Sequence, residues 1–213
     1  EGIMKTLGLL SGGLDSTVAL HWSLREHAET RSLAIDYGQR HMIELNIAGR
    51  IARAAGVAHE RLFASATGFG AVSSLVAGAA FVPSAAPVLP ARNVVLLAIA
   101  FARAAHHGCD AVVIGACLDD AADFPDCRPE FMRAAETALC LAIGQRIELL
   151  TPLLHMSKAE IGTMAAELGP DAHAAARSSW SCYDPRKSLP CGECRACAAR
   201  ERSGIRAIGG ADA

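Results

Sequence analysis

Two groups of residues, one near each end of the 213-residue chain, have the types and the spacing that chemistry requires. The first follows a short apolar run and consists of Leu10, Ser11, Gly12, Gly13, Leu14, Asp15, Ser16 and Thr17. Adjacent glycines permit a tight turn, so successive N–H groups and the start of a helix can all face one anion. The Gly-Lys-Ser/Thr ending of a Walker loop is absent. The string therefore predicts a different phosphate loop, with an ordinary capped glycine turn as the alternative.

The second group consists of four cysteines near the end of the chain: Cys182, Cys191, Cys194 and Cys197. Two-residue gaps among the last three let thiolates converge on one ion, and a cysteine across a loop completes a closed, structural zinc site. Unpaired thiols, disulfides and an iron–sulfur cluster are the alternatives. The other four cysteines lack such spacing, and we expect most of them to be small core residues: Cys109, Cys117, Cys127 and Cys140.

Lys158 is a candidate functional residue in a chain that has only three lysines: Lys5, Lys158 and Lys187. Lys158 follows Ser157, a residue typical of a helix N-cap, just after the last expected strand. A lysine at such a turn is a candidate contact for phosphate. The alternative is a solvated lysine in the first turn of a helix, a position that does not favour cations.

Composition restricts the class of partner. The chain has 20 basic and 22 acidic side chains, which indicates no broad cationic face, so we expect no nucleic-acid partner. Glycines and prolines interrupt the uncharged stretch from Leu62 to Ala91, so we expect no membrane span there. Eight cysteines without a secretion signal indicate a reducing compartment, and we expect the cytoplasm.

The elements that must position these residues alternate between short apolar strands and longer helical patterns. Strands are expected at Met4–Leu10, Ser32–Asp36, Ala58–Phe63, Ala111–Gly115 and Arg146–Leu150. Helices are expected at Ser16–Glu26, Met42–Ala55, Asn93–His107, Pro129–Ile143 and Lys158–Leu168, with Asn93 and Ser157 as helix starts. This alternation predicts a three-layer α/β fold, a parallel sheet with helices on both faces and its ligand beyond the carboxyl ends of the strands.

The end of the chain has a different character. Apolar periodicity fades after residue 170, and from residue 178 the sequence becomes polar and rich in cysteine. We therefore expect an α/β domain over residues 1–177 and a small zinc-binding lobe over residues 178–213.

The phosphate loop, Ser-Gly-Gly-x-Asp-Ser, resembles that of the PP-loop ATP pyrophosphatase superfamily, whose members cleave ATP between the α- and β-phosphates. Further strings, in order along nearly the whole chain, resemble the 7-cyano-7-deazaguanine synthase family. They lie at residues 36–45 (Asp-Tyr-Gly-Gln-Arg-His, then Glu-Leu), 90–93 (Pro-Ala-Arg-Asn), 124–131 (Phe-Pro-Asp-Cys-Arg-Pro-Glu-Phe), 151–158 (Thr-Pro-Leu, then Ser-Lys) and 181–197. The resemblance implies that 7-carboxy-7-deazaguanine and ammonia become the nitrile at the expense of two ATP, through adenylated intermediates and an amide, in queuosine or deazapurine biosynthesis.

Roles can be assigned to polar residues in these strings. Asp15 and either Asp119 or Asp120 would hold Mg²⁺ on the phosphates, while cationic side chains offset charge as pyrophosphate leaves. The expected catalytic residues are Asp15, Lys158, Arg92 and Asp120. The expected substrate-binding residues are Tyr37, Gln39, Arg40, His41, Phe124, Asp126 and Arg128. Tyr37, Phe124 and Tyr183 are candidates for stacking on a purine-like ring.

Two strings depart from the family pattern. Residues Pro83–Leu89 differ from the usual Asn-Thr-aromatic approach to Pro-Ala-Arg-Asn, and the second departure lies before residue 125. Members commonly carry Tyr-Ser-Gly-Tyr before Pro-Asp-Cys-Arg, whereas this chain has Ala121, Ala122, Asp123 and Phe124 there. These departures leave open an amide-forming relative that stops after one ATP. A PP-loop tRNA thiolase is a second alternative, which the near-neutral charge disfavours, and a binding module on an inactive scaffold is a third.

The resemblance also implies a homodimer. We expect its contact surface to draw on the uncharged segment from Leu62 to Ala91, since large apolar patches usually mark association. The alternative is that this segment folds over its own active site as a lid.

Overall fold

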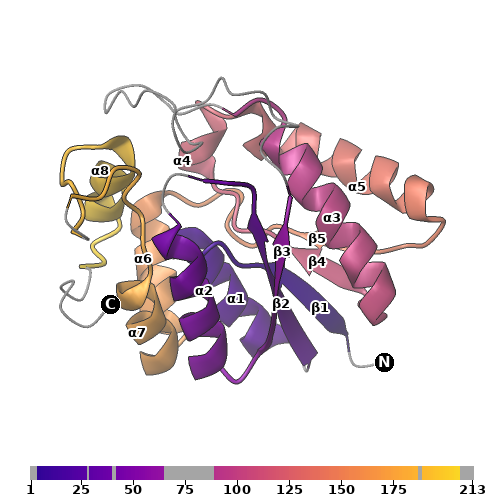
Figure 1. The fold of residues 1–213 in the computed structure, drawn as a ribbon, viewed down its shortest axis with the longest axis horizontal. Coiled ribbons are helices and arrows are strands. Elements are labelled where there is room, and N and C mark those ends of the chain that lie inside the picture. The colour runs from indigo at the N-terminus through magenta and orange to yellow at the C-terminus, as the bar shows by residue number, and fades with distance from the viewer. Residues whose placement is uncertain (1–3, 28, 40–41, 65–88, 187–188, 207–213) are drawn as a thin grey trace.

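A five-stranded parallel sheet runs through the protein in the computed structural model, which describes residues 4–27, 29–39, 42–64, 89–186 and 189–206 (Figure 1). Its strands are β1 (Lys5–Leu9), β2 (Glu29–Asp36), β3 (Ala58–Phe63), β4 (Ala111–Val113) and β5 (Glu148–Leu150). The strand order is β3-β2-β1-β4-β5, and each neighbouring pair is parallel. The chain therefore winds to one side of β1 and then to the other, which opens a crevice at the carboxyl ends of β1 and β4.

Helices cover both faces of the sheet. One face carries α1 (Leu14–Glu26), α2 (Ile43–Ala54), α6 (Lys158–Glu167) and α7 (Pro170–Ser178), and the other carries α3 (Arg92–His107) and α5 (Pro129–Ile143) (Figure 1). Three short elements are α4 (Leu118–Ala121), the 3₁₀ helix η2 (Pro125–Cys127) and α8 (Arg195–Arg202). The predicted three-layer parallel α/β fold is thus confirmed.

The two faces of the sheet have separate hydrophobic cores. On the α3 and α5 side, Leu7 of β1 packs with Phe101 and Leu97 of α3, all three almost fully buried. On the other side, Leu20 of α1 packs with Ile47 of α2. Each such side chain contributes about 1.5–3 kcal/mol on burial, so the sheet is held firmly beneath the crevice.

Two helices near the end of the chain escaped the sequence pattern. The faded periodicity after residue 170 suggested no helix, yet α7 and α8 lie there. Their buried positions are small or charged: Ala172 and Ala176 in α7, and Ala196 and Arg200 in α8. A helix that buries alanine and arginine shows no apolar stripe, which is why periodicity missed both.

The expected helix starts are confirmed at Ser157 and wrong at Asn93. Ser157 forms a full capping box with Glu160, each side chain bonding the other residue's backbone N–H. Helix α3 instead begins at Arg92, after Ala91 in the left-handed region. The Asn93 amide is buried and donates to the carbonyl oxygen of Asp126 at 2.9 Å, because a tertiary partner outcompetes a capping role.

Residues beyond α7 pack directly on the α/β layers. Trp180, Cys182 and Cys194 belong to the hydrophobic cluster that includes Ile47 of α2. The predicted boundary after residue 177 falls within the last turn of α7, and the separate character of residues 178–213 stays a prediction.

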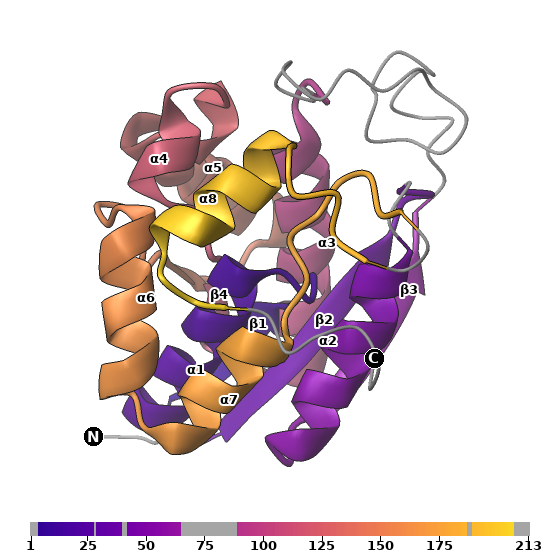
Figure 2. The same ribbon diagram turned by 90° about the vertical axis from the view of Figure 1, so that its left-hand side faces the viewer.

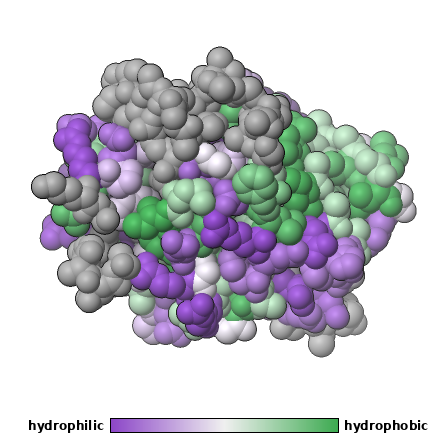
Figure 3. Space-filling model, viewed as in Figure 1, coloured by the Kyte–Doolittle hydropathy of each residue, from purple (hydrophilic) through white to green (hydrophobic). Residues whose placement is uncertain are grey.

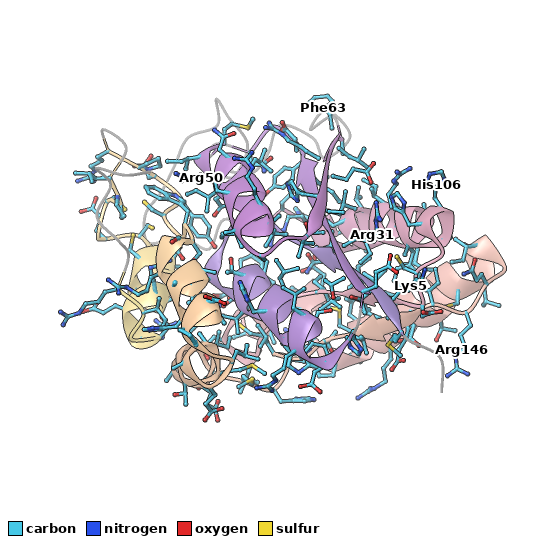
Figure 4. All side chains as sticks on the ribbon, turned by 90° about the horizontal axis from the view of Figure 1, so that it is seen from below. Lys5, Arg31, Arg50, Phe63, His106 and Arg146 are labelled. Atoms are coloured by element: carbon cyan, nitrogen blue, oxygen red, sulfur yellow. The ribbon has the colours of Figure 1, made fainter. Side chains whose placement is uncertain are left out.

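Apolar side chains gather on the surface over α3 and α5 (Figure 3), where Leu141 is 79% exposed. Figure 4 shows Lys5, Arg31 and Arg146 on the side of the sheet away from α8, near the strand starts. None of the described helices combines the length and the apolarity needed to span a membrane. Most of the segment predicted to form a dimer contact, residues 65–88, lies outside the described residues.

Candidate active site and metal site

The phosphate loop connects β1 to α1 and has the conformation that its glycines permit. Gly12 lies at φ +90°, and a Cβ there would overlap the carbonyl oxygen of Glu44. Gly13 is the N-cap of α1, and its N–H donates to Ser11 Oγ at 3.2 Å. Ser16 Oγ lies 3.0 Å from Ser11 Oγ, so two hydroxyls and a helix N-terminus surround one point. This arrangement suits an anion.

Lys158 lies at the base of the crevice and is only 5% exposed. Its Nζ donates to Asp15 Oδ2 at 2.7 Å and to Asp120 Oδ2 at 3.2 Å. Burial by itself would lower the pKa of Lys158, but these carboxylates raise it, so the ammonium stays charged. The alternative of a solvated lysine is wrong, because the first turn of α6 points into the site rather than into solvent.

Asp15 uses only one of its two carboxylate oxygens to bind Lys158. Burial raises the pKa of Asp15, Lys158 opposes that shift, and Asp120 adds to it. While Oδ2 binds Lys158, Oδ1 is buried and has no hydrogen-bond partner among the described residues. Carboxylate oxygens of Asp15 and Asp120, together with Cys117 Sγ, lie within 4.8 Å of one another. An unpartnered buried oxygen beside a second carboxylate fits a hard divalent cation.

Cys117 is a member of this cluster that sequence reasoning took for a core residue. Its Sγ lies 3.1 Å from Lys158 Nζ and 3.2 Å from Asp120 Oδ2. Burial, with help from Asp15 and Asp120, raises the pKa of the thiol to about 12, so it stays protonated and is a poor ligand for Mg²⁺. Its place shortly after β4, at the carboxyl end of the sheet, is the one sequence signal that pointed to the site.

The crevice contains a cavity of about 290 Å³ with an apolar floor and a polar rim. The floor is formed by side chains from β1, β2, α3 and the end of β4: Leu9, Leu33, Ile35, Leu96 and Ile114. The four expected catalytic residues all line the cavity: Asp15, Lys158, Arg92 and Asp120. Apolar side chains next to phosphate-binding groups suit a nucleotide, whose ring is apolar on its faces and whose phosphates are anionic.

An aromatic and cationic wall closes one side of the cavity. Tyr37, Gln39, Phe124 and Tyr183 line it together with Arg92. Burial alone would lower the pKa of Arg92, but Tyr37 and Tyr183 raise it, and Tyr37 also hydrogen-bonds the guanidinium. The Arg92 guanidinium lies 5.9 Å from the centre of the Phe124 ring. Four of the expected site residues therefore converge on one wall.

Other expected site residues lie elsewhere. Gly12 and Thr17 shape the phosphate loop without lining the cavity, and the Thr17 hydroxyl donates to Gly13 O at 2.7 Å. Asp126 accepts the Asn93 N–H at 2.9 Å, and the exposed Arg128 donates to Ala121 O at 3.1 Å. Neither lines the cavity, and their role in substrate binding stays a prediction. Arg40 and His41 lie outside the described residues.

The cavity also has lining residues that sequence reasoning did not single out. These are Glu44 of α2, Trp180 and Ser181 after α7, and three arginines of α8: Arg195, Arg200 and Arg202. Arg195 pairs with Asp123, and Arg202 pairs with Asp119 at 3.2 Å, so two ion pairs between cavity-lining residues join α8 to the α4 region (both helices are labelled in Figure 2). Glu44 and Ser181 lie within the strings that resemble the family but were given no role, whereas the arginines of α8 reach the cavity only through the fold.

The four late cysteines form a second, separate cluster. Their Sγ atoms all lie within 4.8 Å of one another, with 3.6 Å between Cys194 and Cys197 and 4.0 Å between Cys191 and Cys197. A tetrahedral ion with metal–sulfur bonds of about 2.3 Å requires sulfur separations of about 3.8 Å. The hydrogen bond between the Cys182 and Cys194 thiols lowers the pKa of Cys194 and raises that of Cys182, so the two sulfurs share a proton that a metal ion would displace. The donor set fits a closed tetrathiolate metal site.

A phosphate loop without a Walker lysine, at the crevice of a parallel sheet and facing a buried lysine, defines the ATP-dependent PP-loop class of enzymes. Among solved structures, a predicted subunit of tRNA methyltransferase from Methanocaldococcus jannaschii has a similar fold, with a TM-score of 0.55. The match covers 82% of this chain and 85% of that chain at 16% identity, a level that shows the fold alone.

Sequence comparison identifies the family within that class. The family model described as "Queuosine biosynthesis protein QueC" matches residues 5–207, and the chain belongs to this family. A 7-cyano-7-deazaguanine synthase from Leptospira interrogans is 36% identical in an alignment 217 positions long, which covers 93% of this chain and 85% of that protein. The 7-cyano-7-deazaguanine synthase 1 of Sphingopyxis alaskensis is 40% identical in an alignment 217 positions long, which covers 96% of this chain and 94% of that protein.

Proposed function

We propose that this protein is a 7-cyano-7-deazaguanine synthase, which uses ATP, Mg²⁺ and ammonia to convert 7-carboxy-7-deazaguanine into the nitrile. The observation that carries the proposal is the cavity itself. It brings the phosphate loop, the buried Lys158 and an aromatic wall within reach of one another, in a chain of the QueC family. A site for phosphate and a site for a flat ring thus share one space.

The chemistry requires two activations of the same carbon. In the first, a carboxylate oxygen of the substrate attacks the α-phosphorus of ATP, and pyrophosphate leaves. Ammonia then displaces AMP from the acyl carbon and gives the amide after loss of a proton. In the second, the amide oxygen attacks the α-phosphorus of another ATP, and pyrophosphate leaves. Loss of AMP and of both N–H protons then leaves the carbon–nitrogen triple bond. Each round makes the oxygen part of a good leaving group, so one site serves both.

The residues of the crevice have matching roles. Gly13 and the hydroxyls of Ser11 and Ser16 bind phosphate oxygens at the N-terminus of α1. Lys158 sits between two carboxylates, so its ammonium is held in place before negative charge develops on the departing pyrophosphate. Arg92 and the aromatic wall bind the deazaguanine ring, whose faces favour stacking and cation–π contact.

Two metals complete the proposal. Asp15 and Asp120 would hold Mg²⁺, which neutralises phosphate charge when bound, and the unpartnered Asp15 Oδ1 supports that assignment. Zn²⁺ would occupy the tetrathiolate site formed by Cys182, Cys191, Cys194 and Cys197. With four sulfur ligands, zinc would have no open position for catalysis, so its role would be structural.

The remaining partners follow from the same reasoning. Free ammonia serves as the nitrogen donor in this proposal, since it is the nucleophile that displaces AMP in the reaction described above. We propose a cytoplasmic homodimer that binds no nucleic acid and no membrane. The free thiols support a reducing compartment, and the apolar surface over α3 and α5 supports association.

The experiment is an incubation of the purified protein with 7-carboxy-7-deazaguanine, ATP, Mg²⁺ and ammonium, followed by mass spectrometry of the products. The nitrile is the expected product. An amide as the final product would instead identify a ligase that stops after one ATP. Sulfur transfer to tRNA with no turnover of the deazapurine would identify a thiolase, and no pyrophosphate release with either substrate would identify an inactive scaffold.

A further inference from the structure

Arg200, in the last turn of α8, is a charged residue that the roles above leave unused. It is 9% exposed, and no carboxylate lies within ion-pair distance of it in the part of the chain that the structure describes. Its Nε is buried and lacks a hydrogen-bond partner there. Burial lowers the pKa of the guanidinium. Because burying a guanidinium without an anionic partner is costly, its other bonds must offset that cost.

Those bonds all lead to one short segment of the chain. Nη1 donates to Ser179 O at 2.9 Å, to Ser179 Oγ at 3.0 Å and to Ser181 Oγ at 3.2 Å. Nη2 donates to Ala176 O at 2.9 Å and to Arg177 O at 3.2 Å. The last two are carbonyls at the C-terminal end of α7, where a positive charge is favoured. Arg200 thus ties α8 to the end of α7 and to residues 179–181.

The same segment holds the phosphate loop. The N–H of Trp180 donates to Gly12 O at 2.9 Å. In a trans peptide the C=O and the N–H point in opposite directions, so this bond directs the Gly13 N–H away from Trp180. Gly13 lines the cavity, and its N–H bonds Ser11 Oγ. The orientation of a phosphate-binding N–H therefore depends on where Trp180 is held.

At its other end, α8 belongs to the tetrathiolate site. Cys194 is the N-cap of α8, and Cys197 lies in its first turn, three residues before Arg200. The site that fixes these sulfurs therefore fixes the helix from which the arginine projects. The connection therefore runs from the cysteine cluster along α8 to Arg200, through its hydrogen bonds to Ser179 and Ser181, and through the backbone N–H of Trp180 to the phosphate loop.

We propose that Arg200 is a positioning residue for ATP, which transmits the rigidity of the four-cysteine site to the phosphate loop. This inference rests on the proposed function only in taking ATP as the ligand of the phosphate loop. Without Arg200, residues 179–181 lose the bonds that anchor them, the Gly12–Gly13 peptide becomes free to rotate, and phosphate affinity falls. The metal site and the ring-binding wall are expected to stay intact.

The test compares Arg200→Met with Arg177→Met, which removes an exposed arginine from the same segment and whose side chain lies outside the cavity lining. Calorimetry measures the Kd of α,β-methylene ATP with Mg²⁺, and separately the Kd of 7-carboxy-7-deazaguanine. We expect Arg200→Met to weaken analogue binding by about tenfold or more, and to raise the KM for ATP in parallel. Ring binding should change by less than about threefold, and the zinc content should match the wild type. Arg177→Met should match the wild type throughout.

Arg200→Lys provides the second variant, because lysine keeps the charge but cannot reach both sets of acceptors. We expect it to bind the analogue with an affinity between those of the wild type and Arg200→Met. If Arg200→Met fails to fold, at least threefold weaker binding by Arg200→Lys supports the proposal. Wild-type affinity in folded Arg200→Lys or Arg200→Met overturns it, as does equal weakening of ring binding. Analogue binding needs no turnover, so a product other than the nitrile would refute the proposed function alone.

Discussion

Replacing Lys158 with methionine removes the positive charge at the base of the cavity and keeps most of the side-chain volume. The lost contacts are those to Asp15 at 2.7 Å and to Asp120 at 3.2 Å. At an effective dielectric constant of about 20, these distances correspond to attractions of about 6 and 5 kcal/mol. Desolvation offsets much of that sum, and removing one partner of a buried ion pair costs about 3–5 kcal/mol net. Since the side chains of Asp15 and Asp120 keep 23% and 33% of their surfaces exposed, we expect the free energy of unfolding to fall by about 3 kcal/mol.

The decrease in the free energy of unfolding of Lys158→Met should depend on pH, and the surroundings of Asp15 determine whether it grows or shrinks as pH rises. Burial already raises the pKa of Asp15 above 3.8, and removing Lys158 takes away an effect that lowers it. Between 3.8 and the raised value, the folded variant binds more protons than the unfolded chain, so its free energy of unfolding falls as pH rises. We therefore expect Lys158→Met to be less destabilising at pH 5 than at pH 8.

Urea unfolding at both pH values measures this effect, and Lys5→Met is the matched control. Lys5 pairs with Glu29 at 3.2 Å, but both side chains are 47% exposed, so its removal should cost no more than about 1 kcal/mol at either pH. Pyrophosphate release by Lys158→Met should fall about 10²–10³-fold, the usual effect of losing one electrostatic group. Equal stability losses in the two lysine variants, or full turnover by Lys158→Met, would refute this account of the site.

Asp15→Asn should nearly abolish AMP formation and leave the protein folded, which AMP assays and circular dichroism would check; wild-type turnover would contradict the role. Gly12→Ala should weaken ATP binding far more than Gly56→Ala, because both glycines have positive φ but only Gly12 meets backbone atoms, and equal ATP affinities would contradict this. Cys194→Ala should remove zinc and lower the melting temperature more than it lowers kcat, whereas unchanged metal content would disprove the site. Ammonium should support turnover without glutamine, and strict dependence on glutamine would exclude free ammonia as donor.

The parts of the protein that sequence reasoning predicted are those with local causes. The strands and most helices follow from short-range apolar patterns, and the Ser157 cap depends on a residue three positions away. The phosphate loop needs two adjacent glycines, one of which has a conformation and a neighbour that exclude other residues. The four-cysteine cluster follows from two-residue gaps. These features could be identified from the chain because the determining residues are neighbours in sequence.

The parts that escaped prediction depend on residues far apart in the chain. Cys117 has no ligand spacing, and its place in the site comes from α6 bringing Lys158 beside it, 41 residues on. Arg200 lies in a polar stretch that suggests an exposed helix, yet it is buried against the end of α7 and residues 179–181. Asn93 matches a capping residue, but its amide bonds a carbonyl 33 residues away. Each depends on tertiary packing, which local patterns do not encode.

The count of AMP formed per nitrile tests the central claim most directly, that one cavity activates the same carbon twice. With limiting 7-carboxy-7-deazaguanine and excess ATP, Mg²⁺ and ammonium, chromatography of the completed reaction should give two AMP and two pyrophosphate for each nitrile, with the amide appearing and then disappearing. A ratio of one AMP per substrate consumed, with the amide as the lasting product, would contradict the claim.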